Sequence, residues 1–512
     1  MTGFYCNEAK DYHEKLIADP YRPGYHFAMP AGFAWPGDPN GAFFADGTYH
    51  LMYLYINRRM DAYCWGHISS HDLLHWCMRP DALTDLEGDR GCFSGGAFVD
   101  EDGTAYLSFW KFPSKDYRTD NGGIALAWAR PPYDEWTRME PIAINGSRKI
   151  WGTVDVETPE GIRHVGCADP SNIWKANGHY YMQTGNKSVL DAYGRDEDSE
   201  EQYRGDWCDL FRSDDLKEWT YVGRFYARPE TGDRPDDSED DMCPSFLPLP
   251  DRASGGRLTD DYLQLFISHN HGAQYYVGRL QDERFYPEGH GRFSWNDKAC
   301  FAPEALIDDK NRQLAWYWLL DNPEGEMERF GWSGVYSFPR ALWIEGGTLH
   351  MAPAEELKRL EYNRQTFEQG VISGRRGLPV KNGASFRIYA AIDMSAATRA
   401  GFSVRVSPDG AERTDIYYDR VSRRLVFDAT RSGGDGWRIK EEAPFEIEDG
   451  ETLALDLFVD QSVVEVYANE RQAICRRVYP TDPGSAVGVE AISDGARFER
   501  IEACEMARTN FY

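Results

Sequence analysis

The chain has 512 residues and a formal net charge of −28, with 84 acidic against 56 basic side chains. That length is too great for one ordinary hydrophobic core and predicts two domains. A strongly negative surface repels phosphate groups, so we expect neither nucleic acid nor an anionic membrane as a partner. Aromatic residues at 14%, with 48 glycines and 27 prolines, favour many short strands over long helices.

The N-terminal residues and the cysteines both indicate a cytoplasmic protein. Residues 1–8 (MTGFYCNE) lack a basic region followed by an apolar one, and no later apolar run is long enough to span a bilayer. The ten cysteines show neither CxxC pairs nor zinc-ligand spacing. We therefore expect mostly reduced, buried thiols, with disulfides as the less favoured alternative, and no metal or cofactor. The oligomeric state is open, with a homodimer as one alternative.

The first chemically suggestive stretch is AWPGDPNG at residues 34–41, which follows a short helical pattern at residues 8–17. Pro39 favours extended geometry for Asp38, and the Asn-Gly pair after it is typical of a hairpin turn. A strand pattern follows at residues 48–55. We expect Asp38 to lie on a stiff turn at a strand edge, beside rings of the kind that stack on sugars; an ordinary turn without function is the alternative. The neighbouring aromatic residues are Phe33, Trp35, Phe43 and Phe44.

A strand, turn and tryptophan unit recurs along the chain as far as about residue 345. The segment SHDLLHW at residues 70–76 returns as SDDLKEW at residues 213–219, and a weaker copy lies at residues 125–136. Repeats of this kind predict the blades of a β-propeller, with the tryptophans as packing residues between blades.

The remainder of the chain shows a different β pattern. After a short helical pattern at residues 352–360, apolar and polar residues alternate at residues 385–390, 402–406, 416–418 and 455–469. This alternation is typical of a β-sandwich. We predict a propeller over residues 1–360 and a sandwich over residues 361–512. Because no long low-complexity linker separates them, we expect the two domains to pack firmly.

The Asp-Pro-Asn-Gly motif after a tryptophan resembles the nucleophile motif of glycoside hydrolase family 32, which includes invertases, inulinases, levanases and fructosyltransferases. Further segments match that family in order: WGH at 65–67, CFSGG at 92–96, ADPSNIW at 168–174, FAPE at 301–304 and GWSGVYSFPR at 331–340. The resemblance implies a five-bladed propeller with a C-terminal sandwich. It also implies a retaining β-fructofuranosidase that acts on sucrose, fructo-oligosaccharides or fructan through a fructosyl-enzyme intermediate.

The same resemblance assigns two of the three family carboxylates. Retaining hydrolysis needs a nucleophile and a general acid/base about 5–5.5 Å apart, and the match makes Asp38 the nucleophile. Asp169 matches the carboxylate that stabilises the transition state, although Ala168 replaces the arginine that usually precedes it.

The third carboxylate departs from the family pattern, because Met242 occupies the place of the glutamate before Cys-Pro. Methionine cannot transfer a proton, so the acid must lie elsewhere, and acidic residues crowd the stretch DDSEDDMCP at residues 236–244. Alternation along a strand places Asp240 on the face of position 242, so we predict Asp240 as the donor, then Asp241, then Glu239. Crowded carboxylates raise one another's pKa, which suits a general acid.

Further positions are expected to contact the substrate, and Glu304 is also a reserve candidate for the acid. The predicted substrate contacts are Trp35, Asn40, Trp65, Phe93, Ser94, Glu239, His269 and Glu304.

Three other functions compete with the hydrolase. A fructosyltransferase could form difructose anhydride or oligosaccharides on the same scaffold. A carbohydrate-binding homologue could have lost activity through Met242. A family 43-like arabinosidase or xylosidase shares the propeller and a three-carboxylate layout, but the Asp-Pro-Asn-Gly, Phe-Ser-Gly and sandwich segments argue against it.

Overall fold

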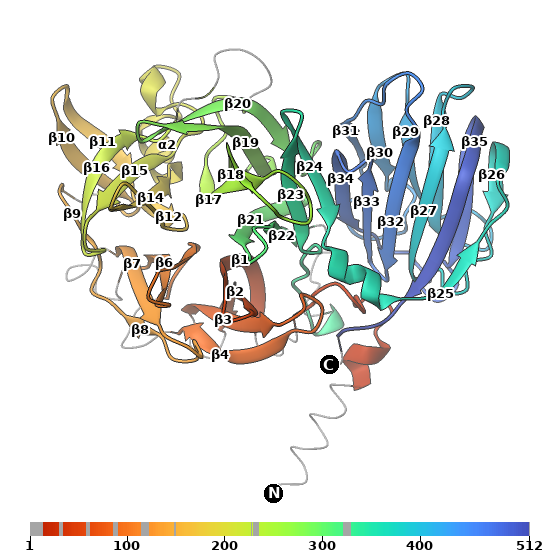
Figure 1. The fold of residues 1–512 in the computed structure, drawn as a ribbon, viewed down its shortest axis with the longest axis horizontal. Helices are drawn as coiled ribbons and strands as arrows, with labels where there is room; N and C mark the ends of the chain where they lie inside the picture. The colour runs from red at the N-terminus through yellow and green to blue at the C-terminus, as the bar shows by residue number, and fades with distance from the viewer. Residues whose placement is uncertain are drawn as a thin grey trace, which may run out of the picture.

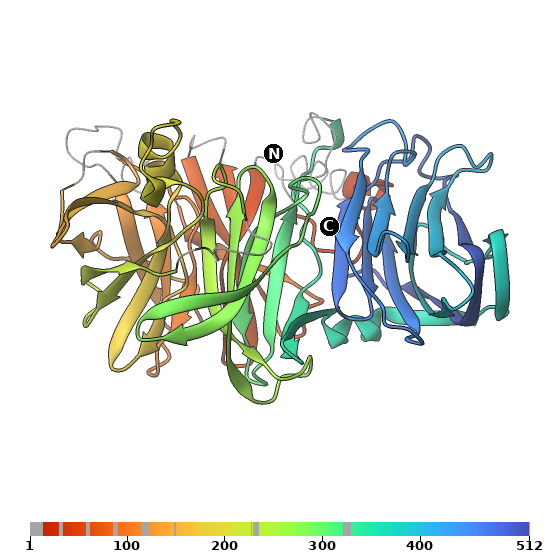
Figure 2. The same cartoon turned by 90° about the horizontal axis from the view of Figure 1, so that it is seen from above.

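A computed structural model describes residues 14–29, 34–57, 62–84, 91–113, 122–147, 150–226, 228, 235–320 and 329–510, without the side chains of residues 34–36. A ring of five β-sheets lies beside a two-layered β-structure (Figures 1 and 2). The predicted all-β fold, a five-bladed propeller followed by a sandwich, is confirmed. Within the described ranges, no helix is both long enough and apolar enough to cross a membrane. The cysteines of these ranges are free thiols, and most are buried; Cys6 lies outside them.

Each blade is built on antiparallel strands, the first of which lies nearest the centre of the ring (Figure 1), and only the short β9 of the third blade pairs in parallel among the described strands of the ring. The first blade holds β1 (Ala34–Ala45), β2 (Thr48–Asn57), β3 (Ala62–Ser70) and β4 (Cys77–Leu83). The second holds β5 (Ala97–Val99), β6 (Ala105–Lys111), β7 (Gly123–Ala129) and β8 (Thr137–Arg138).

The third blade is the most elaborate. It holds β12 (Ala168–Pro170), β14 (His179–Gly185), β15 (Asp209–Ser213) and β16 (Glu218–Arg224), with β13 (Trp174–Ala176) paired to β14 and β9 (Ala143–Ile144) paired to β16. A separate hairpin precedes it, formed by β10 (Thr153–Thr158) and β11 (Gly161–Gly166). The helix α2 (Lys187–Tyr193) and the 3₁₀ turn η1 (Glu201–Tyr203) lie between β14 and β15.

The last two blades are regular. The fourth holds β17 (Met242–Pro250), β18 (Leu258–Ser268), β19 (Gly272–Gln281) and β20 (Arg284–Arg292). The fifth holds β21 (Cys300–Ile307), β22 (Gln313–Leu319), β23 (Arg340–Glu345) and β24 (Thr348–Pro353).

The sequence repeat corresponds to one turn between the third and fourth strands of a blade. In the first blade, Asp72 Oδ1 accepts hydrogen bonds from the backbone of Leu74 and His75 at 3.0 and 2.9 Å. In the third, Asp215 Oδ1 binds two backbone N–H groups in the same way. The residue after each aspartate has a left-handed φ near 63–64°. A carboxylate that satisfies the open backbone donors therefore fixes this turn.

Four of the five innermost strands are interrupted by bulges. The hairpin turn expected at residues 38–41 was wrong, because these residues lie in a bulged part of β1. The register shifts lie in β1 on both sides of Pro39, in β12, in β17 and in β21. Asp169, Cys243 and Ala302 have left-handed φ values of 37°, 48° and 41°. A bulge turns a side chain away from the ordinary alternation of a strand. Asp38 lies at such a bulge inside β1, so its side chain does not follow the alternation of its neighbours. The hairpin between β1 and β2 instead turns at residues 46–47, where both φ angles are positive.

The C-terminal strands form two layers joined by one long strand. After the 3₁₀ turn η2 (Glu355–Leu360), which stands where a helix at 352–360 was expected, the first strands are β25 (Glu361–Thr366), β26 (Gly370–Gly377), β27 (Ser385–Asp393), β28 (Arg399–Val406) and β29 (Thr414–Asp419). They are followed by β30 (Arg424–Asp428), β31 (Lys440–Pro444), β32 (Leu453–Asp460), β33 (Val463–Ala468), β34 (Gln472–Arg477) and β35 (Gly488–Met506).

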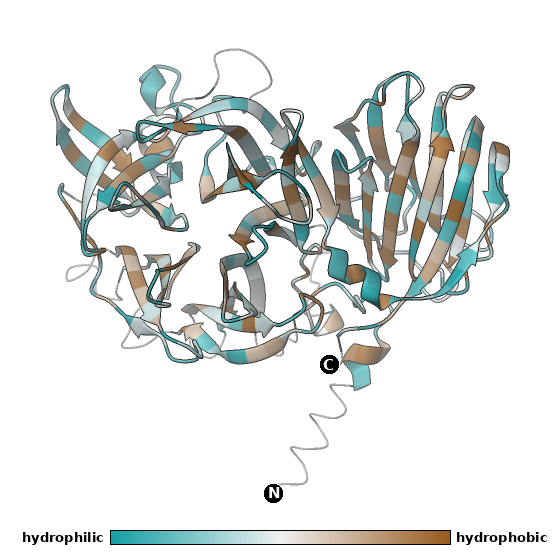
Figure 3. Cartoon of the chain, viewed as in Figure 1, coloured by the Kyte–Doolittle hydropathy of each residue, from teal (hydrophilic) through white to brown (hydrophobic). Residues whose placement is uncertain are grey.

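The strand β35 belongs to both layers. Its first half pairs with β26 and β28, and its second half pairs with β25 and β27. Apolar and polar residues alternate along these strands (Figure 3), so that each layer turns one apolar face inward. A separate apolar cluster contains residues of the propeller and of β32 to β35, and it joins the two parts of the chain.

Candidate active site

Asp38 lies half-buried where the bulge in β1 turns it out of the strand. The hydroxyl of Ser94, from the start of the second blade, donates a hydrogen bond of 2.5 Å to Asp38 Oδ2. Burial raises the pKa of Asp38, while the Ser94 hydrogen bond and the charge of His269 act in the opposite direction. The structure thus brings together the predicted residues Asp38 and Ser94.

The backbone around Asp38 is held by the side chains of Asn40 and Tyr336. Asn40 Nδ2 donates to the carbonyl of Asp38 at 3.0 Å, and Asn40 Oδ1 accepts from the N–H of Gly95 at 3.1 Å. Tyr336 donates its hydroxyl proton to the carbonyl of Gly37 at 2.7 Å. Both ends of the Asn40 amide are therefore engaged with backbone, so this predicted contact fixes the position of Asp38.

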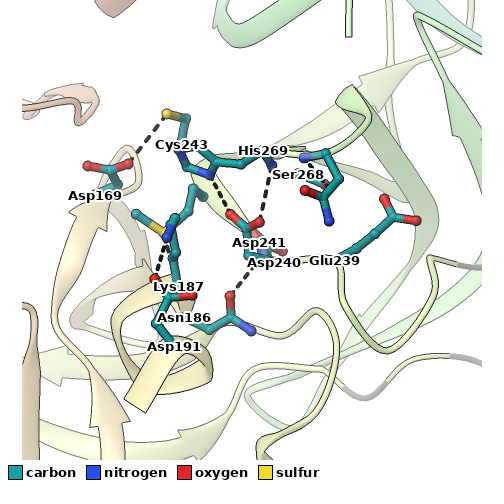
Figure 4. Close-up of polar contacts among 12 residues, drawn as sticks. Asp169, Asn186, Lys187, Asp191, Glu239, Asp240, Asp241, Cys243, Ser268 and His269 are labelled. Atoms are coloured by element: carbon teal, nitrogen blue, oxygen red, sulfur yellow. Dashed lines mark hydrogen bonds and ion pairs between the residues drawn. The ribbon is translucent and has the colours of Figure 1, made fainter. Parts of the chain in front are cut away.

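Asp169 approaches Asp38 across the centre of the ring. Its side chain is buried, and Cys243 Sγ lies 3.5 Å from Asp169 Oδ2 and 3.7 Å from Asp38 Oδ2, as Figure 4 shows in part. Burial and the negative charge of Asp38 raise the pKa of Asp169 to about 7. Asp169 Oδ1 is buried and has no hydrogen-bond partner among the residues that the structure describes. A buried oxygen of this kind beside the nucleophile can accept a hydrogen bond from a substrate hydroxyl.

The three carboxylates before Met242 have three different environments. Glu239 forms an ion pair with Arg292 at 2.8 Å and accepts a 2.6 Å hydrogen bond from Gln274. Burial would raise the pKa of Glu239, but Arg292 outweighs it and the pKa is lowered. Asp241 accepts the hydroxyl proton of Tyr226, and burial raises its pKa well above the ordinary value.

Within the described part of the chain, Asp240 forms side-chain hydrogen bonds with one residue, His269. Asp240 Oδ1 accepts from the backbone N–H of His269 at 3.1 Å, and Oδ2 accepts from the ring Nδ1 at 2.7 Å (Figure 4). The carboxylate is 1% exposed, whereas the His269 side chain is 43% exposed. Burial acts to lower the pKa of His269, but the hydrogen bond and charge of Asp240 outweigh it and the pKa is raised. The sequence indicated both residues but gave no signal that they are paired.

Two further predicted contacts are buried away from the surface. Trp65 is fully buried and donates its indole N–H to the carbonyl of Phe93 at 3.1 Å. Glu304 is also buried; its Oε1 accepts the backbone N–H of Ala42 at 2.7 Å, and burial raises its pKa well above the ordinary value. Both residues support the inner strands. The Trp35 side chain lies outside the described part of the chain.

Comparison with known families covers nearly the whole chain. The profile of the Glycosyl hydrolases family 32 N-terminal domain matches residues 26–353, and the profile of the family 32 C-terminal domain matches residues 355–505. The chain belongs to glycosyl hydrolase family 32.

Curated relatives match nearly the whole of this chain in sequence, and a solved structure matches it in fold. The chain is 26% identical to a sucrose-6-phosphate hydrolase of Zymomonas mobilis, over 97% of this chain and 94% of the relative. It is 26% identical to a levanase of Bacillus subtilis, over 98% of this chain and 72% of the levanase. The crystal structure of fructan 1-exohydrolase IIa from Cichorium intybus superposes with a TM-score of 0.77 at 21% identity, over 96% of this chain and 98% of that one.

The departure from the family 32 pattern at Met242 is visible in the structure. Met242 is 2% exposed, and its sulfur accepts a 3.4 Å contact from the backbone N–H of Lys187 in α2. The position of the usual glutamate is therefore filled by an apolar side chain packed against α2. The next residue, Cys243, turns toward Asp38 and Asp169 through its left-handed backbone.

Several aromatic residues that were not predicted from the sequence lie with Phe93 on the Ser94 side of the site. Trp110 and Trp151 stack at 4.2 Å, and Phe93 lies 4.4 Å from Phe112 and 4.8 Å from Tyr63. The aromatic pattern at residues 109–112 is the only sequence signal for this cluster, because Trp151 belongs to a loop before the third blade.

One group of side chains on the other side of the site has the spacing of metal ligands. Single atoms of Asp236, Glu239 and His271 lie within 4.8 Å of one another. Both oxygens of Glu239 are hydrogen bonded to Arg292 and one also to Gln274. We assign no metal to this group.

Proposed function

We propose that this family 32 protein is a retaining β-fructofuranosidase-type hydrolase of sucrose, fructo-oligosaccharides or fructan. The observation that carries the proposal is the approach of Asp38 and Asp169 to one sulfur atom, Cys243 Sγ. The names of the relatives, sucrose-6-phosphate hydrolase and levanase, support a fructoside as substrate. We further propose that the propeller and sandwich comprise residues 1–360 and 361–512, and that the ligand is a neutral carbohydrate, in keeping with the charge of −28.

The proposed reaction begins with attack by Asp38 on the anomeric carbon of a fructosyl unit. Ser94 holds one carboxylate oxygen and leaves the other free to form the bond. Asp169 accepts a hydrogen bond from a sugar hydroxyl, and this bond strengthens as positive charge develops on the ring. An acid protonates the leaving oxygen, and the same group later removes a proton from the water that releases fructose. We place this acid in the unit formed by Asp240 and His269.

The test measures hydrolysis of sucrose, a fructo-oligosaccharide and an aryl β-fructofuranoside, with the anomeric form of the first product followed by NMR. We expect release of fructose with retained configuration. Asp38→Asn should lower the rate on every substrate by more than about a hundredfold, because an amide of the same shape is a poor nucleophile. An inverted first product, or an Asp38→Asn variant with near-normal rates, would remove the proposal.

A sugar-binding protein without catalysis is the second candidate, and Met242 in place of the family acid is the observation that favours it. This candidate predicts sucrose binding by calorimetry without turnover of any fructoside. A fructosyltransferase would instead convert concentrated sucrose into longer saccharides or difructose anhydride, which chromatography of the products would detect.

A further inference from the structure

The pair formed by Asp240 and His269 stands where the chain lacks the acid of its family. Resting on the proposed function, we infer that His269 is the general acid/base of this enzyme and that Asp240 is its positioning residue. A histidine held by a carboxylate thus takes over the role of the missing glutamate.

Hydrogen bonding or complete burial argues against each of the three loop carboxylates as the proton donor to a substrate. Glu239 is bound to Arg292 and Gln274, and its pKa is lowered, so it stays ionised. Asp241 is fully buried against Tyr226. Asp240 is 1% exposed and has an oxygen on each of two donors of His269, its backbone N–H and its Nδ1.

His269 has the geometry that the three carboxylates lack. Its Nδ1 is fixed by Asp240, while its Nε2 makes no hydrogen bond to any residue that the structure describes. The ring is 43% exposed and packs edge-on to Phe301 at 5.9 Å. Ile267, two residues before His269, pairs with Met242, the residue before Cys243, whose sulfur lies near Asp38 and Asp169. The charge of His269 acts to lower the pKa of both carboxylates, so the ring is close enough to interact with them. A carboxylate on Nδ1 also leaves Nε2 as the atom that gains and loses the proton.

The groups around His269 favour its protonated form. Asp240 precedes β17, Asp38 and Asp169 project from β1 and β12, and Lys187 begins α2. Lys298, before β21, donates its ammonium proton to the His269 carbonyl at 3.0 Å. Burial and Lys187 lower the pKa of His269, whereas Asp240 and Asp169 raise it, and the raising effects are larger. A general acid must carry its proton at working pH.

Both half-reactions balance with His269 as the carrier. In the first, the Nε2 proton passes to the glycosidic oxygen while the bond from the anomeric carbon to that oxygen breaks and the bond to Asp38 forms. In the second, the oxygen of water bonds to the anomeric carbon, the bond to Asp38 breaks, and a proton of water returns to Nε2.

The test compares a poor leaving group with a good one in separate variants. His269→Gln should lower kcat/KM for sucrose by about 10²–10⁴ and should leave the aryl β-fructofuranoside within about tenfold, because an aryloxide departs without protonation. Azide should accelerate release of the fructosyl group in His269→Gln, since an anionic nucleophile needs no general base. His75→Gln removes a histidine bound to Asp72 on the outer face of the first blade and is the matched control.

Asp240→Asn separates a positioning residue from a donor. We expect it to retain part of the sucrose activity and to move the alkaline limb of the pH profile to lower pH, because His269 loses the partner that raises its pKa. The alkaline limb of the wild type should coincide with the titration of the imidazole NMR signal that is missing in His269→Gln.

The outcomes distinguish the inference from the proposed function. If His269→Gln cleaves sucrose normally while Asp240→Asn does not, Asp240 is the donor and the inference is wrong. If kcat/KM of His269→Gln falls equally for sucrose and for the aryl fructoside, His269 does not protonate the leaving group and the inference is also wrong. If the wild type cleaves neither fructoside, the proposed function itself fails. Aryl fructoside activity in His269→Gln shows at the same time that the variant is folded.

Discussion

Asp38 and Asp169 are two carboxylates held close together in a partly dehydrated place, and their interaction costs folding free energy. Burial raises the pKa of each, and the charge of Asp38 raises that of Asp169 further, to about 7. Hydrogen bonds from Ser94 and Cys243 and the charge of His269 act in the opposite direction for Asp38. A site that must hold an ionised nucleophile beside an unsatisfied acceptor is therefore strained electrostatically before substrate arrives.

Replacing Asp169 by asparagine should stabilise the protein at alkaline pH while impairing catalysis. The folded-state pKa of Asp169, about 7, is above the ordinary 3.8, so its favourable contribution is complete below pH 4 and is lost as pH rises through 7. Asp169→Asn removes the buried charge. We expect its Tm to exceed that of the wild type by about 2 °C or more at pH 8, with the difference shrinking towards pH 5, and its kcat to fall strongly.

Scanning fluorimetry at several pH values measures the first effect, and steady-state kinetics the second. A Tm difference that does not change with pH would show that the charge of Asp169 is not the cause.

At the scale of elements, the bulged inner strands decide which side chains meet. The motifs around Asp38, Ser94 and Asp169 could be recognised from sequence, because each is a local run of residues. The order of preference among Asp240, Asp241 and Glu239 as the acid could not be derived reliably from sequence, because the prediction assumed that these residues lie in a continuous strand. Residues 237–238 form a turn and β17 begins only at Met242, so alternation says nothing about where Asp240 points. Its partner His269 is 29 residues away in sequence.

The helix α2 anchors this irregular segment through Asn186, the residue before it. Asn186 Oδ1 accepts the backbone N–H of Asp241 at 2.8 Å, and Asn186 Nδ2 donates to the carbonyl of Gly205 at 2.7 Å. Asn186→Ala would leave two buried backbone groups without partners, at a cost of about 1–3 kcal/mol each. We expect a lower Tm, and a larger loss of kcat/KM on sucrose than on the aryl fructoside, because the pair of Asp240 and His269 shifts with the loop.

The ratio of the two kcat/KM losses is the informative measurement for Asn186→Ala. An equal loss on both substrates would mean that Asn186 supports the whole site and has no special effect on the acid.

At the scale of the whole molecule, the two parts of the chain share one buried interface. Arg340 is fully buried between the rings of Phe293, Tyr317 and Tyr467, with Glu465 at 3.9 Å. The sequence predicted a firm contact from the lack of a linker. It could not indicate that Arg340 meets Tyr467 and Glu465, which lie more than a hundred residues further along the chain and follow no local pattern. Strand alternation sufficed for the sandwich, since buried and less buried residues alternate along strands such as β27, β29 and β32.

The N-terminal segment joins the two parts through one carboxylate of β32. Asp460 accepts hydrogen bonds from the backbone N–H groups of Gly24, Tyr25 and His26 at 2.7–2.8 Å, and from His26 Nδ1 at 3.0 Å. Tyr25 donates its hydroxyl proton to the carbonyl of Val459 at 2.7 Å. Residues 24–26 are thus fixed to the sandwich immediately before the chain enters the first blade.

Asp460→Ala should therefore destabilise the molecule as a whole. The change leaves three buried backbone donors without an acceptor, which costs at least about 3 kcal/mol. We expect a lower midpoint of urea denaturation and faster proteolysis within residues 19–29, whereas Asp449→Ala, which removes an aspartate that is 97% exposed and bound to Arg420 on the surface, should change neither. Because Asp460 fixes residues 24–26, which precede β1 and Asp38 in the chain, sucrose hydrolysis by Asp460→Ala should also fail at a lower temperature than in the wild type. An unchanged denaturation midpoint would show that the hydrogen bonds between the N-terminal segment and Asp460 do not stabilise the protein.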